Sequence, residues 1–116
     1  MQTPQTPSNS SEVFAFAKEY ALLSNLKQQL EKDFKLSGID LTLDSDAPED
    51  IVQRIEAKTV EALQAPNSIQ NLLYTVDVPE AIVASLPTNN PKALSKAIAF
   101  LILKRCWMKV WYKAKY

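Results

Sequence analysis

The longest unbroken apolar run in the chain, residues 97–103 (AIAFLIL), lies inside a predicted helix that spans residues 91–116. At about 100° per residue, these side chains cover almost the whole circumference of the helix, and Ser95 and Lys96 are its polar positions. A helix that is apolar nearly all round is buried in a core unless it spans a bilayer, and this run is far shorter than the roughly 18–20 residues that spanning needs. We therefore expect the other helices to pack around this segment.

The same helix changes character after Leu103, where aromatic and basic residues follow one another. One broad arc carries both tryptophans and a tyrosine. On the other arc, bases at steps of four residues form what we call the basic stripe: Arg105, Lys109 and Lys113. Lys104 falls within the aromatic arc, and its stem is expected to lie along the rings while its ammonium group reaches water or a ring face. We call seven residues of this region the C-terminal patch: Lys104, Arg105, Trp107, Lys109, Trp111, Tyr112 and Lys113.

Glycine is nearly absent, with one Gly against seven Pro in 116 residues. Tight hairpins and phosphate-binding loops need glycine, so a β-rich fold and a glycine-rich nucleotide site are both disfavoured. The length fits one domain with a single core. We predict an all-α fold, a compact bundle of four to five helices with a buried C-terminal helix.

The first helix is predicted from an N-cap at Ser10 or Ser11 to about Leu36, because apolar side chains recur every three to four residues from Phe16 to Phe34. This spacing is close to a seven-residue repeat over some three heptads. A core helix is the favoured interpretation, and a two-chain coiled coil is the alternative, although coiled coils normally need a longer repeat.

Gly38, the only glycine, stands where a helix C-cap needs a left-handed residue. Residues 39–47 then alternate apolar and polar side chains. A single strand would have no partner here, so we predict a loop whose Ile39, Leu41 and Leu43 pack onto the core.

Two later helix starts share the pattern Asp-x-Pro-Glu. Asp46 and Asp77 are predicted as N-caps, each with a glutamate three residues later that completes a capping box. The second helix should end before Pro66, the third should run from about residue 67 to Asp77, and a short fourth should end near residues 86–87. Asn90 is predicted to cap the last helix, whose first position is Pro91.

Residues 1–9 (MQTPQTPSN) are uncharged and rich in Thr, Pro and Gln, so we expect a disordered tail before a single helical domain at residues 10–116. The N-terminal sequence has neither a basic region nor a following apolar stretch, so no secretory signal is predicted. We expect no transmembrane segment and a cytoplasmic location.

The residue types disfavour catalysis. The chain has no His and a single Cys, which removes the commonest general base and any multi-cysteine zinc site. Cys106 has no His partner and is expected to be a small core residue. The acidic cluster at residues 44–50 lacks the glycine and the spacing of a calcium loop. We expect no enzyme, no cofactor and no metal site.

Charge is strongly segregated although the net charge is zero. Residues 31–61 hold nine acids against four bases, whereas residues 92–116 hold seven bases and no acid. We predict a protein–protein interaction or regulatory module that binds another protein, or itself, through the C-terminal patch, because Trp, Tyr, Met and Arg are enriched in interface cores. The alternative is binding of nucleic acid or an anionic membrane surface through the basic stripe. A third interpretation is that the rings pack inward and the bases are merely solvated.

Overall fold

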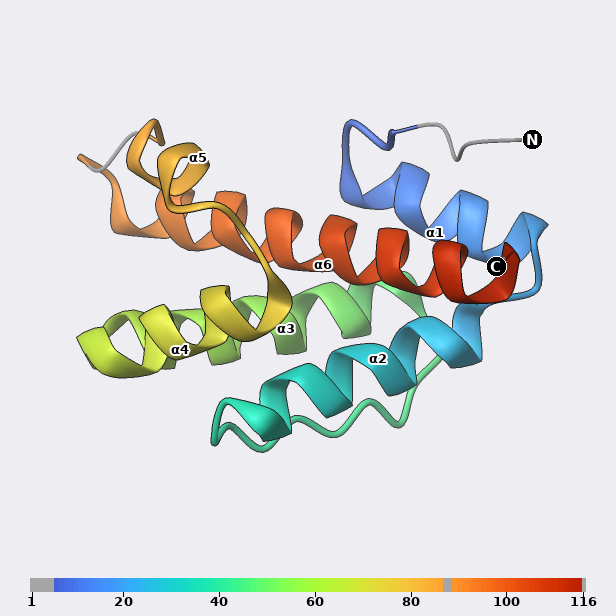
Figure 1. Ribbon diagram of the computed structural model, residues 1–116, viewed down its shortest axis with the longest axis horizontal. Coiled ribbons are helices and arrows are strands. Elements are labelled where there is room, and N and C mark those ends of the chain that lie inside the picture. The colour runs from blue at the N-terminus through green and yellow to red at the C-terminus, as the bar shows by residue number, and fades with distance from the viewer. Residues whose placement is uncertain (1–5, 87–88, 116) are drawn as a thin grey trace.

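A computed structural model describes residues 6–86 and 89–115 and contains helices but no strand in these ranges (Figure 1). This confirms the predicted all-α class. The structure has one helix more than the upper limit that we expected. The six helices are α1 (Ser10–Glu19), α2 (Leu23–Leu36), α3 (Pro48–Leu63), α4 (Pro66–Val76), α5 (Glu80–Ala84) and α6 (Pro91–Lys115).

The α6 helix forms the axis of the molecule, as predicted. Its 25 residues give a length of about 37 Å at 1.5 Å per residue, close to the longest dimension of the protein, 38 Å. Helices α1, α2, α3 and α4 all contact it, and Figure 1 shows them along its length. No helix in the described ranges combines the length and apolar character that crossing a membrane requires.

One face of α6 is buried, rather than its whole circumference. The buried side chains run from Ser95 to Trp111, whereas Phe100 and Leu101 are only half-buried. Ser95, which we expected on a polar side, is buried and donates its hydroxyl to the Lys92 carbonyl at 2.9 Å.

The predicted first helix is wrong in one respect, because the chain breaks it into α1 and α2. Ala21 adopts a left-handed φ of 56°. The Leu22 amide donates to the Ala17 carbonyl at 2.8 Å and the Ala21 amide donates to the Lys18 carbonyl at 3.2 Å. These two bonds form a Schellman motif, which normally ends with glycine. No glycine or proline marks the break, so the sequence pattern missed it.

The break shifts the phase of the buried side chains. In α1 the core residues are Val13, Phe14 and Ala17, whereas Phe16 is half-buried and Tyr20 is exposed. A heptad stripe running through both helices, and with it the coiled-coil alternative, therefore loses its basis.

The cap of α1 is Asn9 rather than Ser10 or Ser11, and its side chain accepts a bond from the Glu12 amide at 2.9 Å. Ser8 also bonds the Glu12 carboxylate. Ser8 and Asn9, which we expected to belong to a disordered tail, therefore bond the first turn of α1. Residues 1–5 of the expected tail lie outside the described residues.

The starts of the later helices are close to the prediction, but the two capping boxes are wrong. The Asp46 carboxylate instead accepts an ion pair from Lys27 at 2.7 Å, and α3 begins without a side-chain cap. Asp77 adopts a left-handed φ of 73° at the end of α4 and pairs with Arg105.

The predicted cap at Asn90 is confirmed, since its side-chain oxygen accepts bonds from two amides at the start of α6. The expected ends at residue 87 and Tyr116 lie outside the described residues.

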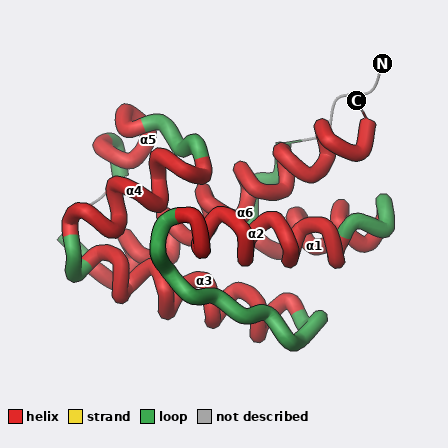
Figure 2. Tube along the Cα trace, turned by 60° about the horizontal axis from the view of Figure 1, so that its bottom comes forward, coloured by secondary structure: helices red, strands yellow, loops and turns green. Residues whose placement is uncertain are grey.

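Residues 39–47 form a loop, as predicted, which Figure 2 shows as a long green segment. Gly38 ends α2 with a left-handed φ of 84°. Leu41 and Leu43 are buried, and the Leu43 amide donates to the Glu31 carboxylate at 2.8 Å. Alternate side chains therefore tie this loop down onto the helices.

Ala21→Gly should stabilise the protein by about 0.5–1 kcal/mol, because a left-handed alanine carries a steric cost that glycine avoids. The change in the free energy of unfolding is measured by urea denaturation. Ala57→Gly, in the exposed middle of α3, is the matched control and should cost about 1 kcal/mol. A loss of similar size at both positions would contradict the proposed strain at Ala21.

Candidate interaction surfaces

The two tryptophans of the C-terminal patch complete the core. Trp107 and Trp111 are both 0% exposed. The Tyr20 ring lies 4.5 Å from the Trp111 ring between centroids, in an edge-on arrangement, and the Lys115 ammonium group lies 4.8 Å from the Trp111 centroid. This cluster joins the end of α1 to the end of α6. Neither indole ring is available to a partner in this structure.

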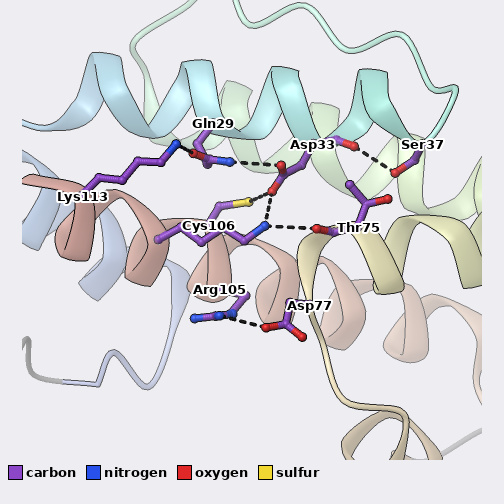
Figure 3. A network of polar contacts seen from close by, with 9 residues as sticks. Gln29, Asp33, Ser37, Thr75, Asp77, Arg105, Cys106 and Lys113 are labelled. Carbon is purple, nitrogen blue, oxygen red and sulfur yellow. Dashed lines mark hydrogen bonds and ion pairs between the residues drawn. The ribbon is translucent and has the colours of Figure 1, made fainter.

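Each base of the basic stripe, Arg105, Lys109 and Lys113, contacts a neighbouring segment of the chain, although Lys113 is exposed to solvent. The Arg105 guanidinium donates to Asp77 at 2.9 Å, the Lys109 ammonium group donates to the Asp33 carboxylate at 2.8 Å, and the Lys113 ammonium group donates to the Gln29 side chain at 3.1 Å (Figure 3). The remaining lysine, Lys104, lies 6.0 Å from the Phe100 ring centroid, so it reaches a ring face other than that of a tryptophan.

The carboxylate of Asp33 is the centre of this polar network. Its side chain is 3% exposed. Besides Lys109, it accepts a bond from Gln29 Nε2 at 3.0 Å and one from the Cys106 thiol at 3.5 Å. Lys109 also donates to the Thr75 carbonyl at 3.1 Å, which links α2 and α6 to α4. A buried carboxylate is stable only when it is paired and hydrogen-bonded in this way, so the network is part of the architecture.

The thiol of Cys106 is poorly suited to nucleophilic chemistry. It is buried, and this burial raises the pKa of the Cys106 thiol well above its ordinary value of 9.0, an effect reinforced by the neighbouring Asp33 charge and opposed by Lys109 and Arg105. A neutral thiol is neither a good nucleophile nor a metal ligand. Within residues 6–86 and 89–115, no three acidic or cysteine side chains converge on a site that would hold a metal ion.

A shallow polar groove lies between α2 and α6, with a volume of about 580 Å³. Leu36, 67% exposed, and Tyr112, 40% exposed, contribute its apolar surface. Its lining includes four bases and one carboxylate: Lys32, Arg105, Lys109 and Lys113 with Asp33. Three of these bases already have partners within the protein, and two of those partners are carboxylates.

A larger hollow lies at the opposite end of α6, between α4, α5 and the start of α6, and its volume is about 920 Å³. We call it the apolar groove. Most of the side chains that line it are aliphatic, and they come from four helices and the segment that links α4 to α5. The lining residues are Leu63, Ile69, Gln70, Leu73, Tyr74, Asp77, Val78, Glu80, Val83, Ala84, Leu94 and Ile98.

The floor and the walls of the apolar groove differ in burial. Leu73 and Ile98 are buried, whereas Ile69 and Leu94 are only half-buried, and Tyr74 at the edge is 88% exposed. The α5 helix has no buried residue. Figure 2 places it with α4 at one end of the molecule. Several large aliphatic side chains around one hollow are therefore left partly uncovered.

Our sequence interpretation missed this groove, although a signal for it was present. Residues 62–91, thirty in all, contain only two charged side chains, Asp77 and Glu80. Charged residues make up 22% of the whole chain. A long, nearly uncharged stretch that still has helix signals indicates surface kept free of charge, and a search for charge depletion would have found it.

A second, smaller hollow of about 120 Å³ borders the same segment. It shares Asp77 and Val78 with the apolar groove, and Ile82, 45% exposed, also lines it. Lys104 and Arg105 contribute to this hollow. The C-terminal patch therefore borders this smaller hollow through Lys104 and Arg105, while its remaining members lie in the core or line the groove between α2 and α6.

No family model, no curated protein and no solved structure matches this chain.

Lys109→Met should reduce the free energy of unfolding by about 2–4 kcal/mol, because it leaves the buried Asp33 carboxylate without its cation. In the double variant with Asp33→Leu, the loss should fall short of the sum of the single losses by about 1–3 kcal/mol. Lys27→Met, which breaks the ion pair to the exposed Asp46, is the control and should cost less than about 1 kcal/mol. Urea denaturation measures all four variants, and additive losses would contradict the coupling.

Cys106→Ser should change how stability depends on pH. Because the folded protein holds the pKa of the Cys106 thiol above its ordinary value of 9.0, the thiol ionises first in the unfolded chain. Its contribution is therefore complete below pH 9 and is lost as the pH rises further. The native protein should lose up to about 1.4 kcal/mol per pH unit relative to Cys106→Ser. Urea midpoints under reducing conditions at pH 8 and pH 10 measure this, and parallel curves would contradict it.

Proposed function

We propose that this chain is a protein–protein interaction or regulatory module that docks a partner protein in the apolar groove. The observation that supports this most directly is the hollow of about 920 Å³ with a buried floor, half-buried aliphatic walls and the exposed Tyr74 at its edge. Tyrosine is enriched at interface hot spots, and the core of an interface is more apolar than the rest of the protein surface. The proposed docking surface is therefore centred on α4 and α5, and Lys104 and Arg105 of the C-terminal patch line the smaller hollow beside it.

A protein partner fits this groove better than a small molecule. Sites for small molecules usually bury 70–90% or more of the ligand. The walls of the apolar groove are only half-buried, so a small ligand would remain partly exposed. A protein segment covers the open side with its own surface and buries the walls that the chain leaves uncovered.

The alternative, binding of nucleic acid or an anionic membrane through the basic stripe, has less support. Base stacking needs exposed rings, and both tryptophans are buried. Arg105, Lys109 and Lys113 are engaged within the protein. We propose no enzymatic role, in line with the neutral Cys106 thiol. We propose a cytoplasmic location, which the unpaired Cys106 supports because small secreted domains usually rely on disulfides.

The proposal is tested by photo-crosslinking in the cells that produce the protein. Benzoylphenylalanine replaces Tyr74 at the edge of the apolar groove or, as the matched control, Val60 on the exposed face of α3. We expect discrete protein adducts from position 74 and none from position 60. Val83→Asp should abolish the adducts, because it places a charge in the wall of the groove on a helix without buried residues.

Adducts from position 74 that persist in the Val83→Asp variant, or the absence of any adduct at position 74, would overturn the proposal. Benzoylphenylalanine in place of Tyr112 tests the alternative, in which the basic stripe binds nucleic acid or an anionic membrane. Nucleic acid or lipid crosslinked from position 112, with no protein adduct from position 74, would favour the basic stripe over the apolar groove.

A further inference from the structure

We infer that the apolar groove takes an amphipathic helix whose apolar stripe is flanked by lysine or arginine. This inference rests on the proposed function and specifies the chemistry of the partner. Three features of the groove support it: the arrangement of its aliphatic rows, the sign of the charges around it, and the absence of a matching helix on the described surface of the chain itself.

The aliphatic rows of the groove have helical spacing. Ile69 and Leu73 stand one turn apart on α4, and Leu94 and Ile98 stand one turn apart on α6. The α4 helix has 11 residues, so it is about 16 Å long at 1.5 Å per residue. Anchors at positions i, i+3 or i+4, and i+7 of a partner helix span about 10 Å, which fits along this length. The groove therefore suits a helix of about three turns.

Among the residues that the structure describes, the two charged side chains that line the groove, Asp77 and Glu80, are both acidic, and α4 contains no charged residue. Lys104 and Arg105 line the smaller neighbouring hollow instead. Asp77 shares its charge with Arg105, whereas Glu80 makes no ion pair within the described ranges. A basic flank on the partner thus meets complementary charge, while an acidic flank meets like charge. Such rim contacts affect specificity and association rate more than affinity.

A second copy of the chain does not present such a helix within the described residues. The large exposed apolar side chains are spread thinly, with no more than one on any helix. A helix that binds a groove needs at least two or three apolar anchors on one face. The exposed set is Tyr20, Leu36, Val60, Tyr74, Ile82 and Tyr112. We therefore infer a different protein as the source of the helix.

The inference is tested with three fluorescein-labelled peptides of 15 residues and equal length. The first contains only Leu and Lys, with Leu at helical positions i, i+3, i+4 and i+7. The second has the same composition in an order that scatters the Leu residues around the helix. The third keeps the Leu positions and replaces each Lys with Glu. Fluorescence anisotropy against the full-length protein is measured at 50 mM and 300 mM NaCl.

We expect the ordered Leu/Lys peptide to bind more tightly than the other two. Tyr74→Ala should weaken this binding at least about fivefold through loss of a contact at the edge of the groove, and Glu80→Lys should weaken it most at low salt. Tyr112→Ala and Glu19→Lys make the same substitutions at exposed positions on α6 and α1. These two matched controls should leave affinity within about twofold.

The outcomes separate this inference from the proposed function. If the Leu/Glu peptide binds equally well and depends on Tyr74, the acidic-rim argument is overturned while the docking surface stands. If no peptide responds to Tyr74→Ala, or if the scattered peptide binds as tightly as the ordered one, the helical partner is overturned. The photo-crosslinking at position 74 then decides independently whether the groove docks a protein at all.

Discussion

The α6 helix buries nine side chains along one face, and α1, α2, α3 and α4 each pack against that face. Full burial of a large apolar side chain contributes about 1.5–3 kcal/mol, and Ile98, Ile102, Trp107 and Trp111 are all fully buried. The Tyr20 ring stacks on Trp107 and meets Trp111 edge-on, so the tryptophans join the end of α1 to the end of α6. Among the helices that the structure describes, the five-residue α5 helix is the one that contributes no buried residue to this core.

The ion pair of Asp33 and Lys109 acts differently from apolar burial. A buried pair adds little net stability compared with apolar residues of similar size, but an incorrectly placed one is costly. Here one carboxylate receives donors from α2 and α6, and Lys109 also reaches the Thr75 carbonyl on α4. We suggest that this geometry sets the register of α2 along α6. The same pairing neutralises Lys109, one of the bases that, in the sequence alone, resemble a surface for anions.

The sequence predicted those features that follow from local periodicity. The last helix, its cap at Asn90 and the Gly38 terminus all have short-range chemical signals, and the structure confirms them. The break at Ala21 was missed because alanine normally favours helix continuation. The roles of the C-terminal patch also stayed open, since a helical wheel shows which residues share a face but not what covers it. The partner of Lys109 lies 76 positions away in the sequence.

The apolar groove is formed largely by a stretch of the sequence that carries few charges, between an acidic and a basic region. Residues 31–61 carry most of the acids and residues 92–116 most of the bases, which leaves residues 62–91 with two charges. The ion pairs of Lys27 with Asp46 and of Arg105 with Asp77 neutralise part of the charged surface. The apolar groove lies in this stretch of few charges, and the five-residue α5 helix beside it is too short to cover its aliphatic walls. An uncovered apolar surface costs free energy in water, so binding that covers it recovers this free energy.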